Sequence, residues 1–264
     1  MVTDVHTYPE ETVVFTATLP RSGFGPRLTA RAGEVWRAMQ DVVADQSNSV
    51  GWTPEAYVKA GTMFVVRSMT VRHAREVKVD EVLTGRTWPS KARRAMLFTR
   101  QVRMFDTGKT LVASATQEWA LLTVHDLQPT RAGQELFDAF KIYEGHPDLE
   151  ELPAPRWKED AQPQRFEFTV WHGWMDPNGH ANHAAYVDYC DEAVARILAS
   201  EGKDPQRVVA IAETVHFRAA ITGGDVVTVE TLELPSTPEG RLFTHRLLVN
   251  GKVCATATLL RTLA

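Results

Sequence analysis

Acid-base side chains alternate along one short segment, residues 176–183, which reads Asp-Pro-Asn-Gly-His-Ala-Asn-His. The imidazole of His180 is the type of group that acts as a general base near neutral pH. Asn178 could orient a water molecule or a substrate carbonyl. Asp176 could hold the imidazole in one tautomer, or attack an electrophilic carbonyl itself. The three side chains together predict an enzyme active site with acid-base chemistry.

The same segment lies between an expected strand, residues 165–171, and an expected helix, residues 183–200. The first N–H groups of a helix have no partner inside the helix and carry partial positive charge. Such groups stabilise the negative charge of an oxyanion that forms during a reaction. We therefore expect the backbone N–H groups of Gly179 and His180 to be oxyanion donors, and the glycine permits close approach of a substrate.

Each of these residues also has a purely structural interpretation. Asp176 is a residue type that starts turns, and Asn178 tolerates the left-handed backbone conformation. Asn182 is expected to cap the following helix rather than to contact substrate. The turn and the chemistry are therefore both predicted from the same few residues.

A metal site is the main alternative use of the histidines. His172 and His183 could combine with Asp176 and His180, but their spacing matches no standard zinc motif. We therefore expect neither a metal nor another cofactor.

The two halves of the chain resemble each other when one is shifted by about 144 positions, which is the signature of a duplication. The matching segments are Thr70-Val71 with Thr214-Val215, Val82 with Val226, Thr84 with Thr228, Thr87 with Thr231, Leu97-Phe98-Thr99 with Leu242-Phe243-Thr244, Gly108-Lys109 with Gly251-Lys252, and residues 113–116 with 255–258. They occur in the same order in both halves, so we predict one architecture built twice.

Each half is expected to contain one strand, one helix and an antiparallel meander, which is an α+β pattern. Helices are predicted at residues 30–47 and 183–200. Strands are predicted at residues 11–19, 62–72, 81–89, 95–105 and 109–123, then at 165–171, 207–218, 225–234, 240–249 and 252–260. Hairpin turns are expected at Gly108 and at Asn250-Gly251. We place an N-terminal domain at residues 1–127, a proline-containing linker with a short helix near 133–143 at 128–164, and a C-terminal domain at 165–264.

This duplicated pattern resembles the double hotdog acyl-ACP thioesterases of bacteria and plants over most of the chain. Residues 51–55 (Gly-Trp-Thr-Pro-Glu) and 64–89 are similar to the N-terminal hotdog of that family, and residues 176–182 followed by Tyr186 are similar to its catalytic signature. The Asp176-Pro start also resembles 4-hydroxybenzoyl-CoA thioesterases, in which an aspartate at this place is catalytic. The resemblance implies two tandem hotdogs, each a curved antiparallel sheet wrapped around a central helix. It implies hydrolysis of fatty acyl thioesters, with acyl-ACP or acyl-CoA as the partner substrate.

Two residues depart from the family pattern. His183 stands where the family has a second asparagine, and Ala220 stands where it has a catalytic glutamate on the following strand. The equivalent position of the first half holds Glu76. Glu192 and Glu213 are the candidates for a supporting acid in the second half. The loss at Ala220 leaves open a non-hydrolytic acyl-binding protein, and an apposition of His180 with Glu76 would favour a dehydratase-like hotdog.

The first half lacks the catalytic residue types, because residues 20–26 contain no Asp, Asn or His. We therefore expect one active site per chain, and we expect the first half to supply the acyl pocket. The candidate pocket residues are Trp36, Met39, Val43, Met63 and Val65. The candidate docking residues for an acidic carrier are the basic Lys91, Arg93 and Arg94, with Arg72, Arg75 and Arg100 nearby in the sequence.

Composition excludes several other classes of protein. A net charge of −4 and a pI near 6.1 argue against a nucleic-acid-binding protein. No signal peptide is visible, and no apolar run reaches the roughly 18 residues that span a bilayer. Cys190 and Cys254 are expected to be buried thiols, as in a reducing compartment. These features predict a cytoplasmic protein without membrane association, either a monomer or a homodimer.

Overall fold

A computed structural model describes residues 7–158 and 160–264 of the chain. The chain divides into two compact units, and unit 2 includes two short segments of the N-terminal half of the sequence. Unit 1 contains the residues up to Leu19, Arg37–Ala74 and Asp80–Glu150. Unit 2 contains Pro20–Trp36, Arg75–Val79 and Glu151–Ala264. Two pieces of the N-terminal half are therefore part of the unit that carries the segment 176–183.

Unit 1 is an antiparallel sheet of five strands with the order β1-β3-β4-β5-β2. The strands are β1 (Phe15–Thr18), β2 (Thr62–His73), β3 (Val82–Arg93), β4 (Leu97–Asp106) and β5 (Leu111–Thr123). Helix α1 (Ala32–Ser49) packs on this sheet, and its residues from Arg37 onward belong to unit 1. Gly85 permits the approach, since a Cβ atom there would lie 2.4 Å from a methyl group of Val42. Two short helices, α2 (Pro54–Lys59) and α3 (Gln134–Ala139), complete the unit.

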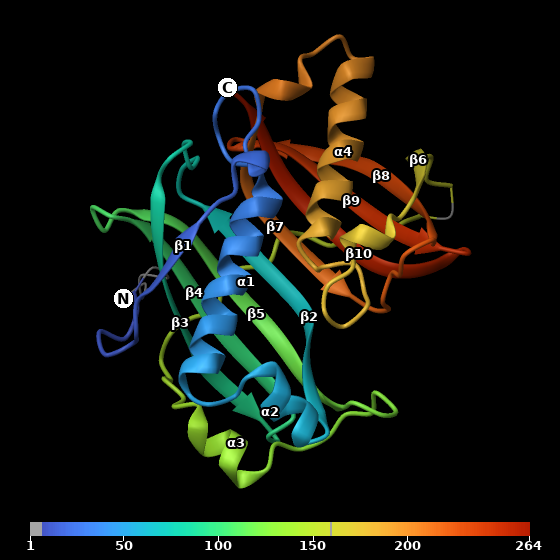
Figure 1. Ribbon diagram of the computed structural model, residues 1–264. Helices are drawn as coiled ribbons and strands as arrows, with labels where there is room; N and C mark the ends of the chain where they lie inside the picture. Colours follow the sequence, from blue (N-terminus) through green and yellow to red (C-terminus); the bar gives the residue numbers. More distant parts are fainter. Residues whose placement is uncertain (1–6, 159) are drawn as a thin grey trace. The chain divides into compact units, whose positions relative to one another are not determined.

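Unit 2 repeats this arrangement with the strand order β6-β8-β9-β10-β7. The elements are β6 (Gln164–Thr169), α4 (Ala185–Ser200), β7 (Val208–Phe217), β8 (Val226–Thr237), β9 (Gly240–Val249) and β10 (Lys252–Leu263). Three 3₁₀ turns also belong to it: η1 (Arg21–Gly23), η2 (His172–Trp174) and η3 (Pro205–Arg207). Each strand has its counterpart five strands earlier, so the predicted tandem α+β hotdog is confirmed (Figure 1).

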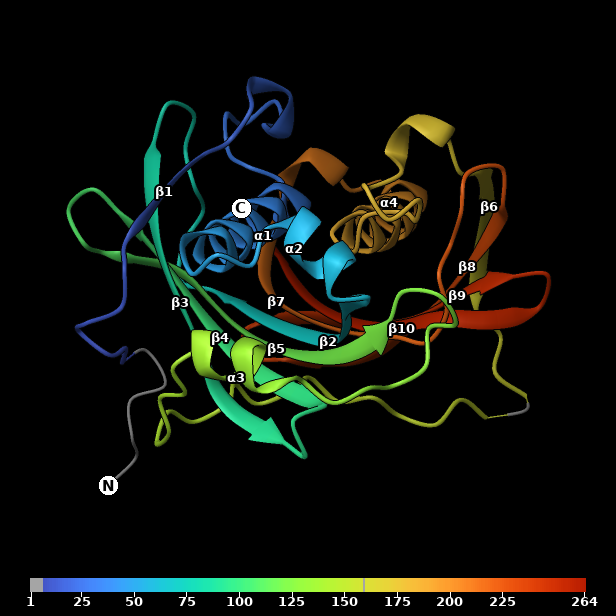
Figure 2. The same cartoon turned by 60° about the horizontal axis from the view of Figure 1, so that its bottom comes forward.

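Helix α4 lies against the concave face of its own sheet, as Figure 2 shows nearly along the helix axis. Its small and aliphatic residues are buried: Ala185, Val187, Cys190, Ala193, Val194, Ile197 and Leu198. Val194, Ile197 and Leu198 pack against Phe243 of β9. Cys190 and Cys254 are both free thiols and both buried, as predicted. None of the helices formed by residues 7–158 and 160–264 has the length and apolar character needed to cross a membrane.

The segment expected to be a linker is packed rather than loose. Helix α3 is shorter than the predicted 133–143, and Phe140 leaves the helix to pack against Leu121. Farther on, Asp148 accepts hydrogen bonds from Lys91 and Gln101 at 2.5 and 3.0 Å. Residues 151–158, which we call the strap, then cross the sheet of unit 2. The strap is held by Leu152 N–H donating to Thr214 Oγ1 at 3.0 Å, and by Thr258 Oγ1 donating to Pro153 O at 2.8 Å.

Candidate active site

The segment 176–183 forms a closed turn between η2 and α4. Asp176 N–H donates to His180 O at 2.7 Å, and Gly179 N–H donates to Asp176 O at 2.9 Å. Gly179 has φ +76°, the left-handed conformation that glycine adopts without strain. Ala181 N–H donates to Ile221 O at 2.8 Å and so ties the turn to the segment that follows β7. The turn is therefore rigid at both of its ends.

The two carboxylate oxygens of Asp176 differ in their hydrogen bonding. Oδ1 accepts the backbone N–H of Asn178 at 2.8 Å and that of His180 at 3.4 Å, an arrangement that stabilises the turn. Oδ2 makes no hydrogen bond to any residue that the structure describes. The structural interpretation of Asp176 is thus correct for one oxygen, while the other remains able to act on a substrate.

The turn is open on the side where a substrate would approach. Asn178 and Gly179 are exposed, and His180 is half-buried. A Cβ atom at Gly179 would meet no atom within 4 Å, so the space above this residue is empty of protein. Among the described residues, no side chain forms a hydrogen bond with the imidazole of His180. Both ring nitrogens of His180 are therefore available to a bound molecule.

The two expected oxyanion donors are occupied in this conformation. Gly179 N–H is bonded to the carbonyl of Asp176, and His180 N–H is directed at Asp176 Oδ1 through the long contact of 3.4 Å. The His180 contact is the weaker of the two, because hydrogen bonds lose strength at such distances. His180 N–H could therefore transfer to a substrate oxyanion at less cost than Gly179 N–H.

Two buried residues with aromatic rings, His183 and Tyr186, lie where the turn meets α4. The prediction that Asn182 caps the helix is wrong, because Ala184 is the N-cap residue of α4 and no described side chain caps it; Asn182 Oδ1 instead accepts Ala184 N–H at 3.0 Å in the turn before the helix. The ring of His183 is buried, with its centroid 6.2 Å from the centroids of both Trp36 and Phe217. Tyr186 is also buried, and burial raises the pKa of its hydroxyl above the ordinary value, with a smaller contribution from Asp176. Tyr186 therefore keeps its proton at neutral pH and lies close enough to Asp176 to influence it.

Sequence patterns did not single out Tyr186 for a role of its own. Only the resemblance to the family signature includes Tyr186. An aromatic residue in the first turn of a helix that follows a polar turn is a sequence signal that could have indicated it. Its burial depends on strands that are distant in the sequence.

The two candidate supporting acids lie in different environments. Glu213 is fully buried, where its carboxylate accepts Arg261 Nη1 at 2.6 Å and Trp36 Nε1 at 3.1 Å. Arg261 also binds Asp191 at 2.8 Å. Burial alone would lower the pKa of Arg261, but Asp191 and Glu213 outweigh it and raise that pKa. Glu192 is exposed and pairs with Arg196. Both carboxylates thus have cationic partners.

The first half contains the same turn without its side-chain chemistry. Gly25 N–H donates to Thr29 O at 2.9 Å, Leu28 N–H donates to Gly25 O at 2.9 Å, and Leu28 has φ +58°. Gly25, Leu28 and Thr29 thus occupy the places of Asp176, Gly179 and His180. The first half lacks the catalytic residue types, as its sequence indicates, but it keeps the backbone.

The same comparison identifies the partner of Ala220. Ala30 N–H donates to Val77 O at 2.8 Å, just as Ala181 N–H donates to Ile221 O. Val77 therefore corresponds to Ile221, and Glu76 to Ala220. Glu76 forms an ion pair with Arg27, which stands where the second half has Asn178.

The remaining predicted residues belong mainly to unit 1. Of the pocket candidates, Trp36 and Met39 are fully buried, and Val43, Met63 and Val65 are half-buried. Of the docking candidates, Lys91 pairs with Asp148, Arg93 pairs with Glu118, and Arg94 is exposed. Arg100 is not part of a basic surface, because it is buried, donates to Gln46, and burial lowers its pKa to about 10.

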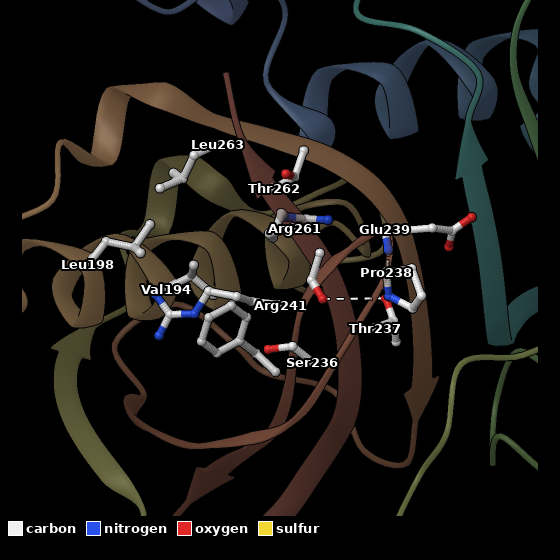
Figure 3. A pocket seen from close by; sticks show the side chains of 12 residues that line it. Val194, Leu198, Ser236, Thr237, Pro238, Glu239, Arg241, Arg261, Thr262 and Leu263 are labelled. Atoms are coloured by element: carbon white, nitrogen blue, oxygen red, sulfur yellow. Dashed lines mark hydrogen bonds between the residues drawn. The ribbon is translucent and has the colours of Figure 1, made fainter.

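A pocket of about 370 Å³ lies elsewhere in unit 2, beside the second half of α4. Figure 3 shows Val194 and Leu198 on one side and the β8–β9 turn on the other, with Arg261 between them. The turn 176–183 lies at the opposite end of α4, so this pocket is not its substrate pocket. Among residues 7–158 and 160–264, no group of three or more His, Cys, Asp or Glu side chains could hold a metal ion.

Comparison with known proteins agrees with this geometry. Residues 24–140 match the family model of the acyl-ACP thioesterase N-terminal domain, and residues 170–262 match that of the thioesterase-like superfamily. A search of curated protein sequences finds no significant match.

Solved structures of similar proteins share the fold along nearly the whole chain. A Lactobacillus plantarum protein provisionally named oleoyl thioesterase has a TM-score of 0.82 at 17% identity, with 96% of this chain and 98% of that chain covered. The 12:0-ACP thioesterase from Umbellularia californica has a TM-score of 0.79 at 18% identity, with 96% and 94% covered. An acyl-ACP thioesterase from Bacteroides thetaiotaomicron has a TM-score of 0.78 at 15% identity, with 95% and 97% covered. The first half of the chain thus matches the acyl-ACP thioesterase N-terminal domain, the second half matches the thioesterase-like superfamily, and together they form a thioester hydrolase with the double hotdog fold.

Proposed function

We propose that the chain hydrolyses fatty acyl-ACP to free acid and carrier thiol at the turn 176–183, with Asp176, Asn178 and His180 as the catalytic residues. One observation carries the assignment of the site. The carboxylate of Asp176 uses Oδ1 to hold the turn and leaves Oδ2 without a described partner, in a turn whose Gly179 has open space above it.

The geometry supports two ways of attacking the thioester. In the first, Asp176 Oδ2 attacks the carbonyl carbon, the thiolate leaves with a proton from His180, and water hydrolyses the resulting anhydride. In the second, Asp176 or His180 removes a proton from water as the water attacks, the C–S bond then breaks, and the same group returns the proton to the leaving thiolate. Asn178 orients the water or the carbonyl in both. The oxyanion is stabilised by His180 N–H released from Asp176, with Gly179 N–H as the further candidate donor.

Non-hydrolytic acyl binding is the second candidate function, and one specific observation favours it. Position 220 carries alanine, and the buried Glu213 is bound to Arg261 and Trp36, so neither supplies a free carboxylate. A dehydratase-like function has less support. Glu76 is paired with Arg27, and no described contact joins Glu76 to His180.

The organisation of the enzyme follows from the same proposal. The second half, residues 165–264, carries the single active site, and residues 1–127 supply the acyl pocket with Trp36, Met39, Val43, Met63 and Val65. Lys91, Arg93 and Arg94 contact the acidic carrier. Acyl-CoA is the alternative substrate, and Glu192 is the exposed carboxylate available in place of the missing glutamate. We propose a cytoplasmic monomer or homodimer that binds neither nucleic acid nor membranes.

Thiol release from matched acyl-ACP and acyl-CoA substrates of several chain lengths tests the proposal. We expect release from at least one acyl-ACP, with a higher kcat/KM than for the corresponding acyl-CoA. Release from acyl-CoA alone would reassign the carrier. If no substrate releases thiol while acyl-ACP still binds, the protein is an acyl-binding module instead.

A further inference from the structure

A second pocket of unit 2 lies beneath the strap and has a volume of about 420 Å³. One wall is the strap itself, with Arg156 and Trp157. The other wall is the sheet, with His216 and Arg218 at the end of β7 and Arg246 on β9. Pockets of this size hold small ligands rather than single ions.

This pocket opens on the face of the sheet opposite to α4. Side chains alternate between the two faces along a strand. Glu213 and Phe217 of β7 face α4, because Glu213 binds Arg261, which also binds Asp191 of α4, and the ring of Phe217 contacts Tyr186. Their neighbours on β7 therefore face the strap, as Leu152 N–H bound to Thr214 Oγ1 confirms. The sheet thus separates this pocket from the turn 176–183.

The lining is cationic and contains no carboxylate side chain. Arg156 and Arg218 are exposed, and neither guanidinium forms an ion pair or hydrogen bond with a residue that the structure describes. Arg246 binds Glu230, which Arg165 shares, so that group of three carries a net positive charge. His216 has one acidic neighbour, Glu151 at 3.5 Å. The pocket therefore has an excess of positive charge that protein carboxylates do not neutralise.

The chemistry of the donors indicates a phosphoryl group. Guanidinium groups bind phosphate through paired, charge-assisted hydrogen bonds, and a phosphoryl group has three oxygens for donors on different sides. Thr256 adds a hydroxyl group to the lining. Trp157, with Arg246 4.2 Å from its ring centroid, adds an aromatic surface for the rest of the molecule.

We propose that the pocket beneath the strap binds a small phosphate ester, with its phosphoryl group between Arg156 and Arg218 and its organic part against Trp157. Because Arg156 is on the strap and Arg218 is on the sheet, the ligand joins the two and holds the strap in place. Neither residue belongs to the catalytic turn, so this site is independent of the function proposed above.

Isothermal titration calorimetry on the full chain tests this site with three probes: inorganic phosphate, adenosine 3′,5′-bisphosphate and 4′-phosphopantetheine. We expect saturable binding of at least one ester, tighter than inorganic phosphate and weakened by salt. The ester that binds shows whether the source is a nucleotide or a pantetheine group.

The double variant R156Q/R218Q should weaken binding at least about tenfold, since charge-assisted hydrogen bonds to phosphate are lost. R131Q, at an exposed arginine outside the pocket, is the matched control and should bind as the wild type does. R156K/R218K should recover part of the affinity, and melting temperatures would show that each variant is folded. The proposal is wrong if no probe binds at millimolar concentration, or if R156Q/R218Q binds as tightly as R131Q.

Discussion

At the residue scale, the question is how one carboxylate both shapes a turn and reacts. Asp176 Oδ1 accepts two backbone N–H groups, which fixes the carboxylate within the turn. Oδ2 makes no hydrogen bond to a residue that the structure describes. The neighbouring hydroxyl of Tyr186 stays protonated because of its burial. The turn therefore holds a carboxylate of which one oxygen has no described partner, and this is the oxygen that we propose reacts.

Asp176→Asn separates the two uses of this side chain. The amide oxygen can still accept the N–H groups of Asn178 and His180, so the fold should be retained. We expect kcat to fall by about 10² or more, and a similar fall for His180→Ala, because each removes an acid-base or nucleophilic group. Steady-state thiol release measures the effect, and near-wild-type rates would show that the site is elsewhere.

A single turnover of the wild type in H₂¹⁸O distinguishes the two modes of attack. If Asp176 is the nucleophile and water attacks the Asp176 carbonyl of the anhydride, the product carries an oxygen from the protein and the label is found in Asp176. We expect this labelled Asp176, since direct attack by water puts the label only in the product.

Ala220→Glu tests whether the missing acid limits the enzyme. In the first half the equivalent Glu76 reaches Arg27, which stands in the place of Asn178. A glutamate at position 220 should therefore reach the catalytic turn. We expect roughly a tenfold gain in kcat, less than the about 10²- to 10⁴-fold that an optimally placed acid-base group contributes. Ala220→Gln is the control of equal size, and equal rates for both variants would show that the carboxylate adds nothing.

At the element scale, strands β7 and β10 are joined to α4 by a buried ion network. Arg261 on β10 donates to both Glu213 on β7 and Asp191 on α4, and Trp36 of α1 is a second donor to Glu213. The carboxylates raise the pKa of Arg261 in spite of its burial. The network fixes the helix on the sheet and also keeps Glu213 from acting as a base.

Arg261→Met should destabilise unit 2 strongly, because it leaves the Glu213 carboxylate buried without its cation. Breaking a buried ion pair in this way costs about 3–5 kcal/mol. Denaturant unfolding measures the loss. The double variant E213Q/R261M should recover part of that stability, since no charge is then left unpaired. An Arg261→Met variant as stable as the wild type would contradict the importance of the network.

At the scale of the whole molecule, buried polar groups set the pH range of stability. His245 on β9 is fully buried, with Nδ1 2.9 Å from Thr231 Oγ1. Burial, with a further contribution from Arg261, lowers the pKa of His245 to about 3. The imidazole is therefore neutral in the folded protein at any pH above that value.

The free energy of unfolding should fall as the solution becomes more acidic than about pH 6.5. The unfolded chain binds a proton on His245 with a pKa near 6.5, and the folded chain does not. The stabilisation is complete above about pH 6.5 and is lost progressively between 6.5 and 3, with a slope of up to about 1.4 kcal/mol per pH unit. Urea unfolding near pH 7, 6 and 5 measures the slope. His245→Gln should show a smaller slope, and an unchanged slope would mean that other groups cause the pH dependence.

The sequence alone was sufficient for local structure and for the duplication. Helices α1 and α4 begin within two residues of their predicted starts, because small and aliphatic side chains recur with helical spacing. The Asn250-Gly251 turn has φ of +49° and +76°, as this dipeptide favours in hairpins. Helix α2 was not predicted, since a six-residue helix shows too little periodicity. The location of the site was predicted from residue types and spacing, and both this location and the catalytic roles remain predictions.

Tertiary structure decided what lies around those residues, because these contacts join positions far apart in the chain. Glu213 meets Trp36 and Arg261, and Glu76 meets Arg27, across separations that no local pattern records. The packing of the strap over the sheet of unit 2 could not be predicted from the sequence for the same reason. Asp176, Asn178 and His180 are brought together by one short turn, so their spacing alone determined that they are neighbours. The burial of Tyr186, the partners of each acid and the cationic pocket beneath the strap depend on strands that meet only in the folded chain.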